Sequence, residues 1–211
     1  MPHHITQRGN YGQNIFISDS DRKQYIHWLR EYSGKYGLSV FAYCLMINHV
    51  HLIVMPDNEK SLSHVLRTLH TKYSQFMNSK AKIKGHLWQG RYFSSVLDEA
   101  YLIAAVRYVE NNPVRAGLVS KPCEWKWSTA RMHCGFDGHE EWLGDIFKLI
   151  DCTQNSWKEL LGQSENTGDI DFIRKCTKVG RPIGGKDFIV RIEDQYKIRF
   201  PSLVRGRPRV L

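Results

Sequence analysis

Two histidines one residue apart mark the most informative short segment of the sequence, Asn48-His49-Val50-His51-Leu52-Ile53-Val54. On a β-strand, side chains alternate between the two faces, so His49 and His51 project together and the intervening hydrophobic residues project the other way. Two imidazoles at this spacing can bind one metal ion. Paired histidines on a solvent-facing strand are also common as ordinary polar surface, so this segment alone is weak evidence of a metal site.

A tyrosine and an asparagine four residues apart form a second chemical feature. Tyr108 and Asn112 fall on one face of a helix expected over Asp98–Asn112. Pro113 is expected to end this helix at about Asn112 and to leave its carboxamide at the helix terminus. A tyrosine beside an amide that can bind metal is what a phosphotyrosine mechanism needs. The alternative is that Tyr108 is a half-buried aromatic residue with its hydroxyl in water.

The elements that must position these residues are predicted by the spacing of hydrophobic residues and by turn signals. The predicted strands are His3–Arg8, Leu38–Met46, His49–Met55 and Trp88–Leu97. The predicted helices run from Asp19 or Asp21 to Gly34 or Gly37, over Ser61–Asn78, and over Asp98–Asn112 with Asp98 as N-cap.

This order of elements predicts an α+β fold. The first six match the β-α-β-β-α-β order of ferredoxin-like folds, in which an antiparallel sheet carries its helices on one face. The helix that carries Tyr108 is then an added C-terminal catalytic helix, and the open face of the sheet is available for a site. Beyond Pro113 the pattern weakens, and we expect a packed return segment at 125–128, a helix over Phe147–Leu161 and a linker over 162–170.

Composition narrows the class of protein. The 211 residues are 42% hydrophobic and 24% charged, as in soluble globular proteins, with no run of 18 or more apolar residues. The five cysteines are odd in number and form no C-x-x-C pair, which argues against a disulfide framework or a zinc ribbon. Together with the absence of a signal-peptide pattern at the first residues, this predicts a cytoplasmic protein.

The positive charge of the chain is unevenly distributed. The formal net charge is +9: residues 1–119 carry 14 basic and 8 acidic groups (+6), residues 120–167 carry 5 and 8 (−3), and residues 168–211 carry 11 and 5 (+6). Two basic blocks around an acidic middle suggest a polyanionic partner contacted by both ends of the chain. Many soluble proteins are basic without such a partner, so charge alone decides little.

Taken together, these residues resemble a known family. An H-hydrophobic-H pattern on a strand, followed by Y-x-x-x-N on a later helix, is similar to the HUH single-tyrosine transposases. More narrowly, five segments within about residues 1–130 resemble the REP-associated tyrosine transposases: His3–Asn10, Tyr43–Met46, Asn48–Val54, Trp88–Tyr92 and Asn112–Val119. One departure is Ile47, where the family usually has proline, and it affects the turn before the histidines, not the histidines themselves.

The resemblance implies an insertion-sequence type DNA transposase that nicks and rejoins single-stranded DNA. It implies that His49, His51 and Asn112 bind a divalent ion, Mg²⁺ or Mn²⁺, and two imidazoles favour Mn²⁺ on chemical grounds. It also implies that Tyr108 is the nucleophile, which forms a 5′-phosphotyrosine and frees a 3′-OH. We see no dedicated base for the tyrosine proton and no P-loop motif for ATP.

The implied partners are single-stranded DNA and DNA hairpins, specifically repetitive extragenic palindromes with a single-stranded guide sequence at the foot. Trp88 and Tyr92 either stack on unpaired bases or pack in the core. The terminal Arg-Gly-Arg-Pro segment resembles an AT-hook core, and the alternative is a generic basic tail. The predicted DNA contacts are Arg8, Asn10, Lys82, Lys84, Arg91, Arg115, Arg205 and Arg207.

We expect three regions: a catalytic domain over residues 1–130, a helical or irregular connecting segment over 131–165, and a basic C-terminal extension over 166–211 as a candidate DNA-binding tail. A monomer associated with the bacterial nucleoid is preferred over a homodimer. Three alternatives stay open: a non-catalytic DNA-hairpin-binding protein derived from a transposase, a transposase that acts as an obligate dimer, and an RNA-binding ferredoxin-like module.

Overall fold

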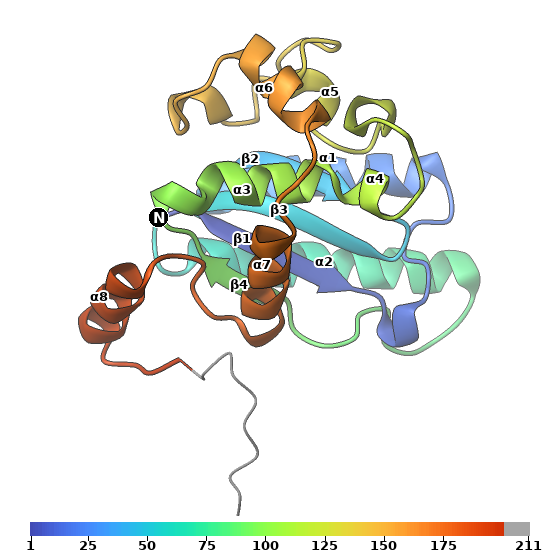
Figure 1. Ribbon diagram of the computed structural model, residues 1–211. Coiled ribbons are helices and arrows are strands. Elements are labelled where there is room, and N and C mark those ends of the chain that lie inside the picture. Colours follow the sequence, from blue (N-terminus) through green and yellow to red (C-terminus); the bar gives the residue numbers. More distant parts are fainter. Residues whose placement is uncertain (201–211) are drawn as a thin grey trace, which may run out of the picture.

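A four-stranded antiparallel sheet forms the centre of residues 1–200, which are the residues described by the structure, a computed structural model (Figure 1). The spatial order of the strands is β2-β3-β1-β4, and all three pairings are antiparallel. The strands are β1 (His3–Arg8), β2 (Leu38–Leu45), β3 (His49–Pro56) and β4 (Phe93–Val96).

Helices α1 (Asp19–Tyr36) and α2 (Ser61–Ala81) cover one face of this sheet. Helix α1 begins where the Asp21 carboxylate accepts a hydrogen bond from the Ser18 N–H, and it ends at Gly37, whose φ of 68° favours glycine. The hydrophobic stripes of both helices pack on side chains from β1, β2 and β3 in one buried cluster. The elements therefore follow one another as β-α-β-β-α-β, and the predicted α+β class with an antiparallel sheet is confirmed.

The other face of the sheet is covered as well, so the prediction of an open face was wrong. Helix α3 (Glu99–Glu110) packs across β2 and β3, and α7 (Thr167–Val179) packs against β4 and β1 (Figure 1). Both helices carry hydrophobic side chains that need a surface on which to bury themselves, such as Leu102, Val106 and Ile173. The site must therefore be sought between the sheet and these two helices.

The remaining elements fold around these layers. The helix predicted over Phe147–Leu161 begins later, after Thr153, whose side chain accepts a hydrogen bond from the Ser156 N–H. The segment 162–170, predicted as a linker, includes the first turn of α7. The remaining helices are α4 (Asn112–Arg115), α5 (Ala130–His133), α6 (Gln154–Gly162), α8 (Lys186–Tyr196) and the short 3-10 helices η1 (Asn10–Gly12), η2 (Pro122–Glu124) and η3 (Ile146–Lys148). In the part of the chain that is described, no helix is long and apolar enough to cross a bilayer.

Strand β4 is shorter than predicted, because much of the segment 88–97 is an irregular loop held by side chains. The Trp88 indole N–H donates a hydrogen bond to the His70 carbonyl of α2. Asp98 is the N-cap residue of α3, as predicted, but its carboxylate makes no capping bond among the described residues and instead accepts a hydrogen bond from the Gly185 N–H at 3.4 Å.

The return segment predicted at residues 125–128 runs along the outer edge of β2. The Leu45 N–H donates a hydrogen bond to the Trp127 carbonyl, and the Thr129 N–H donates one to the Tyr43 carbonyl. This segment, which the hydrophobic pattern predicted, gives β2 a backbone partner on its otherwise unpaired side.

Glu110, at the end of α3, has a fully buried carboxylate that contacts side chains from three other segments. It accepts hydrogen bonds from the Thr129 hydroxyl (2.6 Å) and from the Trp157 indole N–H (2.9 Å). The Nδ1 atom of His133 lies 2.6 Å from the same carboxylate. The cluster fixes the end of α3, which carries Tyr108, to α5 and α6.

Replacing Glu110 by alanine is expected to lower the free energy of unfolding by about 3–5 kcal/mol, because three buried donors lose their acceptor. Urea unfolding followed by circular dichroism measures this loss. The matched control is Glu99→Ala, an exposed glutamate in the first turn of the same helix, which should cost about 1 kcal/mol or less. Equal losses in the two variants would contradict the structural role of the Glu110 cluster.

Candidate functional site

The two histidines of the H-x-H segment lie at the beginning of β3, on the face covered by α3 and α7. In the sheet, His49 is opposite Arg8 of β1 and His51 is opposite Thr6. The two imidazole rings are 5.0 Å apart between centroids and nearly perpendicular. The predicted alternation is confirmed, because three side chains of β3 are fully buried in the core on the opposite face: Val50, Leu52 and Val54.

Both histidines are held through their Nδ1 atoms. The Nδ1 atom of His49 donates to the Asn48 carboxamide oxygen at 2.7 Å, and the Asn48 side-chain N–H in turn donates to the Gly12 carbonyl. The Nδ1 atom of His51 lies 2.9 Å from Nε2 of His4. Within residues 1–200, the Nε2 atoms of His49 and His51 form no hydrogen bond. This donor set fits a divalent metal ion, because metal-bound imidazoles use one ring nitrogen and are oriented through the other.

Burial keeps these imidazoles neutral. It lowers the pKa of His49 to about 4, with the nearby Arg8 guanidinium as a second cause. Burial also holds the pKa of His51 well below its ordinary value of 6.5, followed by the effects of His49, His4 and Arg115. A neutral imidazole is the form that binds metal, so the site needs no deprotonation at pH 7.

Tyr108 of α3 lies against the histidines. The centroid of its ring is 5.7 Å from that of His51 and 5.7 Å from that of His4, in edge-to-face geometry. Only 8% of the residue is exposed. The structure thus brings Tyr108 together with the H-x-H pair, as the sequence predicted.

A guanidinium group holds Tyr108 from its other side. The centre of the Arg115 guanidinium lies 4.3 Å from the Tyr108 ring centroid, and its Nη2 donates a hydrogen bond to the Tyr108 carbonyl. The Arg115 Nη1 also pairs with the Glu165 carboxylate at 2.6 Å. Arg115, which the sequence analysis assigned to DNA, thus contacts both Tyr108 and Glu165.

Asn112 does not end the helix, as had been predicted, but begins α4. The Ala116 N–H donates to the Asn112 carbonyl, so helical turns continue beyond Pro113, which stands in a first turn where its missing N–H costs little. The Asn112 carboxamide is half-buried and forms no hydrogen bond within residues 1–200. In that part of the chain no three His, Cys, Asp or Glu side chains form a metal-ligand group.

Three residues near the site were not predicted from the sequence: His4, Glu165 and Thr177. The alternation of side chains along β1 could have predicted the position of His4. His4 lies on the same face of the strand as Thr6 and Arg8, which pair with His51 and His49. Glu165 and Thr177 have no such signal, because only the packing of the C-terminal region brings them to the sheet.

The predicted DNA contacts that the structure describes come from several elements. Arg8 is exposed beside His49, and Asn10 lies in η1, directly after β1. Lys82 and Lys84 are exposed in the loop after α2. Arg205 and Arg207 lie outside the described residues.

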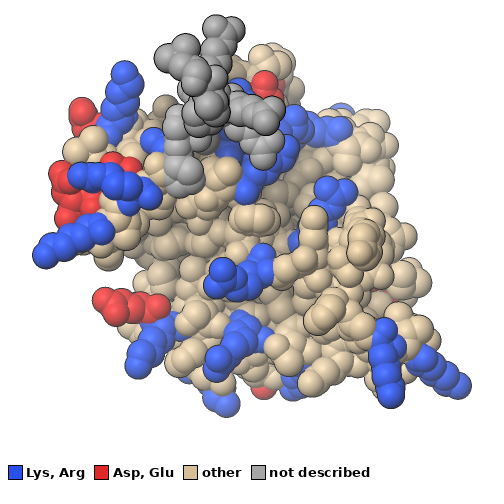
Figure 2. All heavy atoms as spheres, turned by 90° about the horizontal axis from the view of Figure 1, so that it is seen from below, with Lys and Arg blue, Asp and Glu red and all other residues tan. Residues whose placement is uncertain are grey.

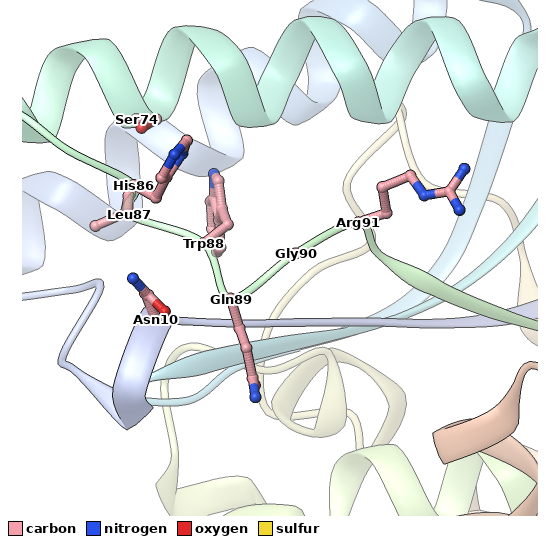
Figure 3. Close-up of a pocket in the computed structure, with 8 residues that line it drawn as sticks. All are labelled: Asn10, Ser74, His86, Leu87, Trp88, Gln89, Gly90 and Arg91. Carbon is pink, nitrogen blue, oxygen red and sulfur yellow. The ribbon is translucent and has the colours of Figure 1, made fainter.

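A groove of ≈ 1260 Å³ runs between α2 and the loop before β4. Its lining includes Arg8, Arg67 and Arg91, so it leads from α2 toward the edge of the histidine site. Figure 3 shows an adjoining hollow, where His86 and Trp88 point toward α2 and Gln89 points to the other side of the loop. On the face seen in Figure 2, Lys and Arg side chains are widely spread, whereas Asp and Glu gather toward one side.

Trp88 and Tyr92 pack against the core beneath this groove. The Trp88 ring is 4.6 Å from the ring of the buried His70. Trp88 and Tyr92 are themselves partly exposed. Both rings therefore pack against the core and also line the groove.

The chain is similar in sequence to one family of known proteins. Residues 1–112 match the sequence profile of the family described as "Transposase IS200 like". No curated protein sequence matches the chain.

Two solved structures are similar. One is a REP-associated tyrosine transposase bound to a REP hairpin: it is 17% identical, with a TM-score of 0.54, and the match covers 69% of this chain and 86% of that one. The other is a transposase candidate from Deinococcus radiodurans R1, 20% identical, with a TM-score of 0.39 and coverage of 53% and 89%. At these identities the likeness to the first structure concerns the fold.

Proposed function

The chain belongs to the IS200-like transposase family, and from this premise we propose that it cuts and rejoins single-stranded DNA through a covalent link to Tyr108. The observation that carries the proposal is the meeting of Tyr108 with the H-x-H pair, at 5.7 Å between the rings of Tyr108 and His51. A phenol beside two neutral imidazoles with free Nε2 atoms is the arrangement that a metal-assisted tyrosine nucleophile requires.

In this proposal His49, His51 and Asn112 hold a divalent ion, Mg²⁺ or Mn²⁺. When bound, the ion supplies polarisation of the scissile phosphate and stabilises negative charge on it. The protein contributes the orientation of the ligands: Asn48 fixes His49, and His4 fixes His51.

Tyr108 supplies the nucleophilic oxygen. Its Oη attacks the phosphorus, a Tyr–O–P bond forms, and the bond from phosphorus to the 3′-oxygen of the preceding nucleotide breaks. The products are a 5′-phosphotyrosine and a 3′-OH, and the tyrosine proton is transferred to the leaving oxygen by way of solvent. Rejoining reverses these steps with a 3′-OH as nucleophile, so the bond energy is conserved and no ATP is consumed.

The proposed substrate is a DNA hairpin of the repetitive extragenic palindrome type with a single-stranded foot. It is supported by the similar fold of a transposase whose structure holds a REP hairpin, and by the basic groove that leads to Arg8. Arg8, Asn10 and Arg91 are proposed to contact the DNA there, with Lys82 and Lys84 on the loop after α2. Arg115, and Arg205 and Arg207 of the C-terminal tail, are proposed as further contacts.

A cleavage assay tests the proposal. Hairpin oligonucleotides taken from beside the gene, with and without Mn²⁺, should yield a covalent protein–DNA adduct only with the metal. A phosphorothiolate at the scissile position traps this adduct for mass spectrometry. Hairpin binding without any adduct would favour the alternative of a non-catalytic hairpin-binding protein that keeps the fold of a transposase.

The acid dependence of metal binding offers a separate prediction. Since the pKa of His49 is about 4 and that of His51 is also lowered, protons compete with metal only near that pH. We expect the apparent Mn²⁺ affinity to fall by no more than about 3-fold from pH 7.5 to 5.5, whereas two imidazoles of ordinary pKa would lose about 100-fold. Isothermal titration calorimetry at both pH values measures this, and a loss near 100-fold would contradict it.

A further inference from the structure

A chain of three side chains connects the H-x-H pair to the C-terminal region. His51 Nδ1 lies 2.9 Å from His4 Nε2, and His4 Nδ1 lies 3.1 Å from the Thr177 hydroxyl oxygen. All three residues are buried. Thr177 is on α7, more than sixty positions beyond the segment that matches the family profile.

The packing of α7 makes this contact a fixed one. Its buried Ile173 and Cys176 lie in the core cluster shared with α3. Just beyond the helix, the Ile183 N–H donates to the Val96 carbonyl, and the Asp98 N–H donates to the Ile183 carbonyl. The Thr177 hydroxyl is therefore directed at His4 by the end of α7, which is held at the edge of β4.

The direction of the hydrogen bonds decides whether His51 can bind a cation. A metal at His51 Nε2 requires the proton on Nδ1, which then donates to His4 Nε2. His4 must in turn carry its proton on Nδ1 and donate it to Thr177. If the bonds ran in the opposite sense, His51 would carry its proton on Nε2, where the cation has to bind.

We propose that Thr177 is a positioning residue for the metal site: its hydroxyl oxygen is the terminal acceptor that keeps the Nε2 lone pair of His51 available through His4. This inference rests on the proposed function, because it concerns the same metal. The inference adds Thr177, a residue of the C-terminal region, which is connected to the metal ligand His51 through two hydrogen bonds.

Removal of the hydroxyl leaves a buried His4 Nδ1 without a partner. An unpaired buried N–H is tolerated less well than an unpaired acceptor. In Thr177→Val the hydrogen bonds should therefore reverse, so that His51 carries its proton on Nε2. Metal binding must then move this proton from Nε2 back to Nδ1. Mutation of residues that hydrogen-bond to metal-bound histidines typically lowers metal affinity 10–100-fold.

Two measurements test the inference. The first is the Mn²⁺ dissociation constant by calorimetry, which we expect to rise about 10-fold or more in Thr177→Val and to stay within about 2-fold of wild type in Thr177→Ser, which retains the hydroxyl. The second is the ¹⁵N chemical shift of the His51 ring nitrogens in the metal-free protein, which distinguishes the two tautomers. The Nε2-protonated fraction should be larger in Thr177→Val than in wild type or Thr177→Ser.

Thr129→Val is the matched control, because it also removes a buried threonine hydroxyl behind the sheet, but one bonded to Glu110. It should lose stability and keep wild-type Mn²⁺ affinity. If Thr177→Val does not fold, Thr177→Ala removes the same hydroxyl with less crowding. A folded variant without the hydroxyl that keeps the wild-type tautomer and affinity would overturn the role of Thr177, whereas a wild-type protein that binds no Mn²⁺ would overturn the metal site itself.

Discussion

Replacement of Tyr108 by phenylalanine is expected to reduce DNA cleavage to less than about one thousandth of the wild-type rate, because the only atom removed is the oxygen proposed to attack phosphorus. The fold should be unaffected. The ring keeps its contacts with His4 and His51, and the Arg115 guanidinium can stack on phenylalanine as it does on tyrosine. Hairpin affinity should therefore stay within about 3-fold of wild type, as measured by fluorescence anisotropy.

The matched control is Tyr101→Phe on the same helix, where the tyrosine ring packs against Phe172 away from the histidines. It should cleave at the wild-type rate. Covalent adducts that persist in Tyr108→Phe would move the nucleophile to Tyr92 or Tyr101, and mass spectrometry of the adduct peptide would identify it.

Replacement of His49 by alanine is expected to abolish metal-dependent cleavage and to weaken Mn²⁺ binding by about 100-fold or more, because one of two imidazole ligands is lost. His49 is a cleaner choice than His51. Loss of His51 also removes the partner of the buried His4, which would lower stability and confuse the result. The Nδ1 atom of His49, in contrast, donates a hydrogen bond to the half-buried Asn48.

His27→Ala provides the control for this variant, since His27 is exposed on α1 and its nearest charged partner is Glu31. Its Mn²⁺ affinity and cleavage rate should equal those of the wild type. Undiminished Mn²⁺-dependent cleavage by His49→Ala would contradict the assignment of the metal site.

The sequence predicted the parts of the site that depend on local periodicity. Alternation on β3 placed His49 and His51 on one face, as the structure has them. This holds because a residue's side of a strand follows from its position in a short repeat. The element order from β1 to β4 was predictable for the same reason.

The features that the sequence did not predict depend on contacts between distant segments. Thr177 is 173 positions from His4 along the chain, and Glu165 is 50 positions from Arg115. Neither residue is indicated by a sequence pattern, because the packing of α7 on α3, β1 and β4 brings this part of the chain to the sheet. The short helix α4, which begins at Asn112 just after α3 ends at Glu110, was missed for a local reason: Pro113 was interpreted as a stop, whereas it is accommodated in the first turn of α4.

The segment along the outer margin of β2 bears on how two molecules of this protein can associate. Its bonds to Tyr43 and Leu45, with a further one from the Gly144 N–H to the Val40 carbonyl, occupy the backbone groups that an incoming strand would need. At the opposite margin, Ile183 occupies the end of β4 in the same way. Two copies could join their sheets through β2 only if these bonds were broken, so pairing of two native molecules along β2 is disfavoured.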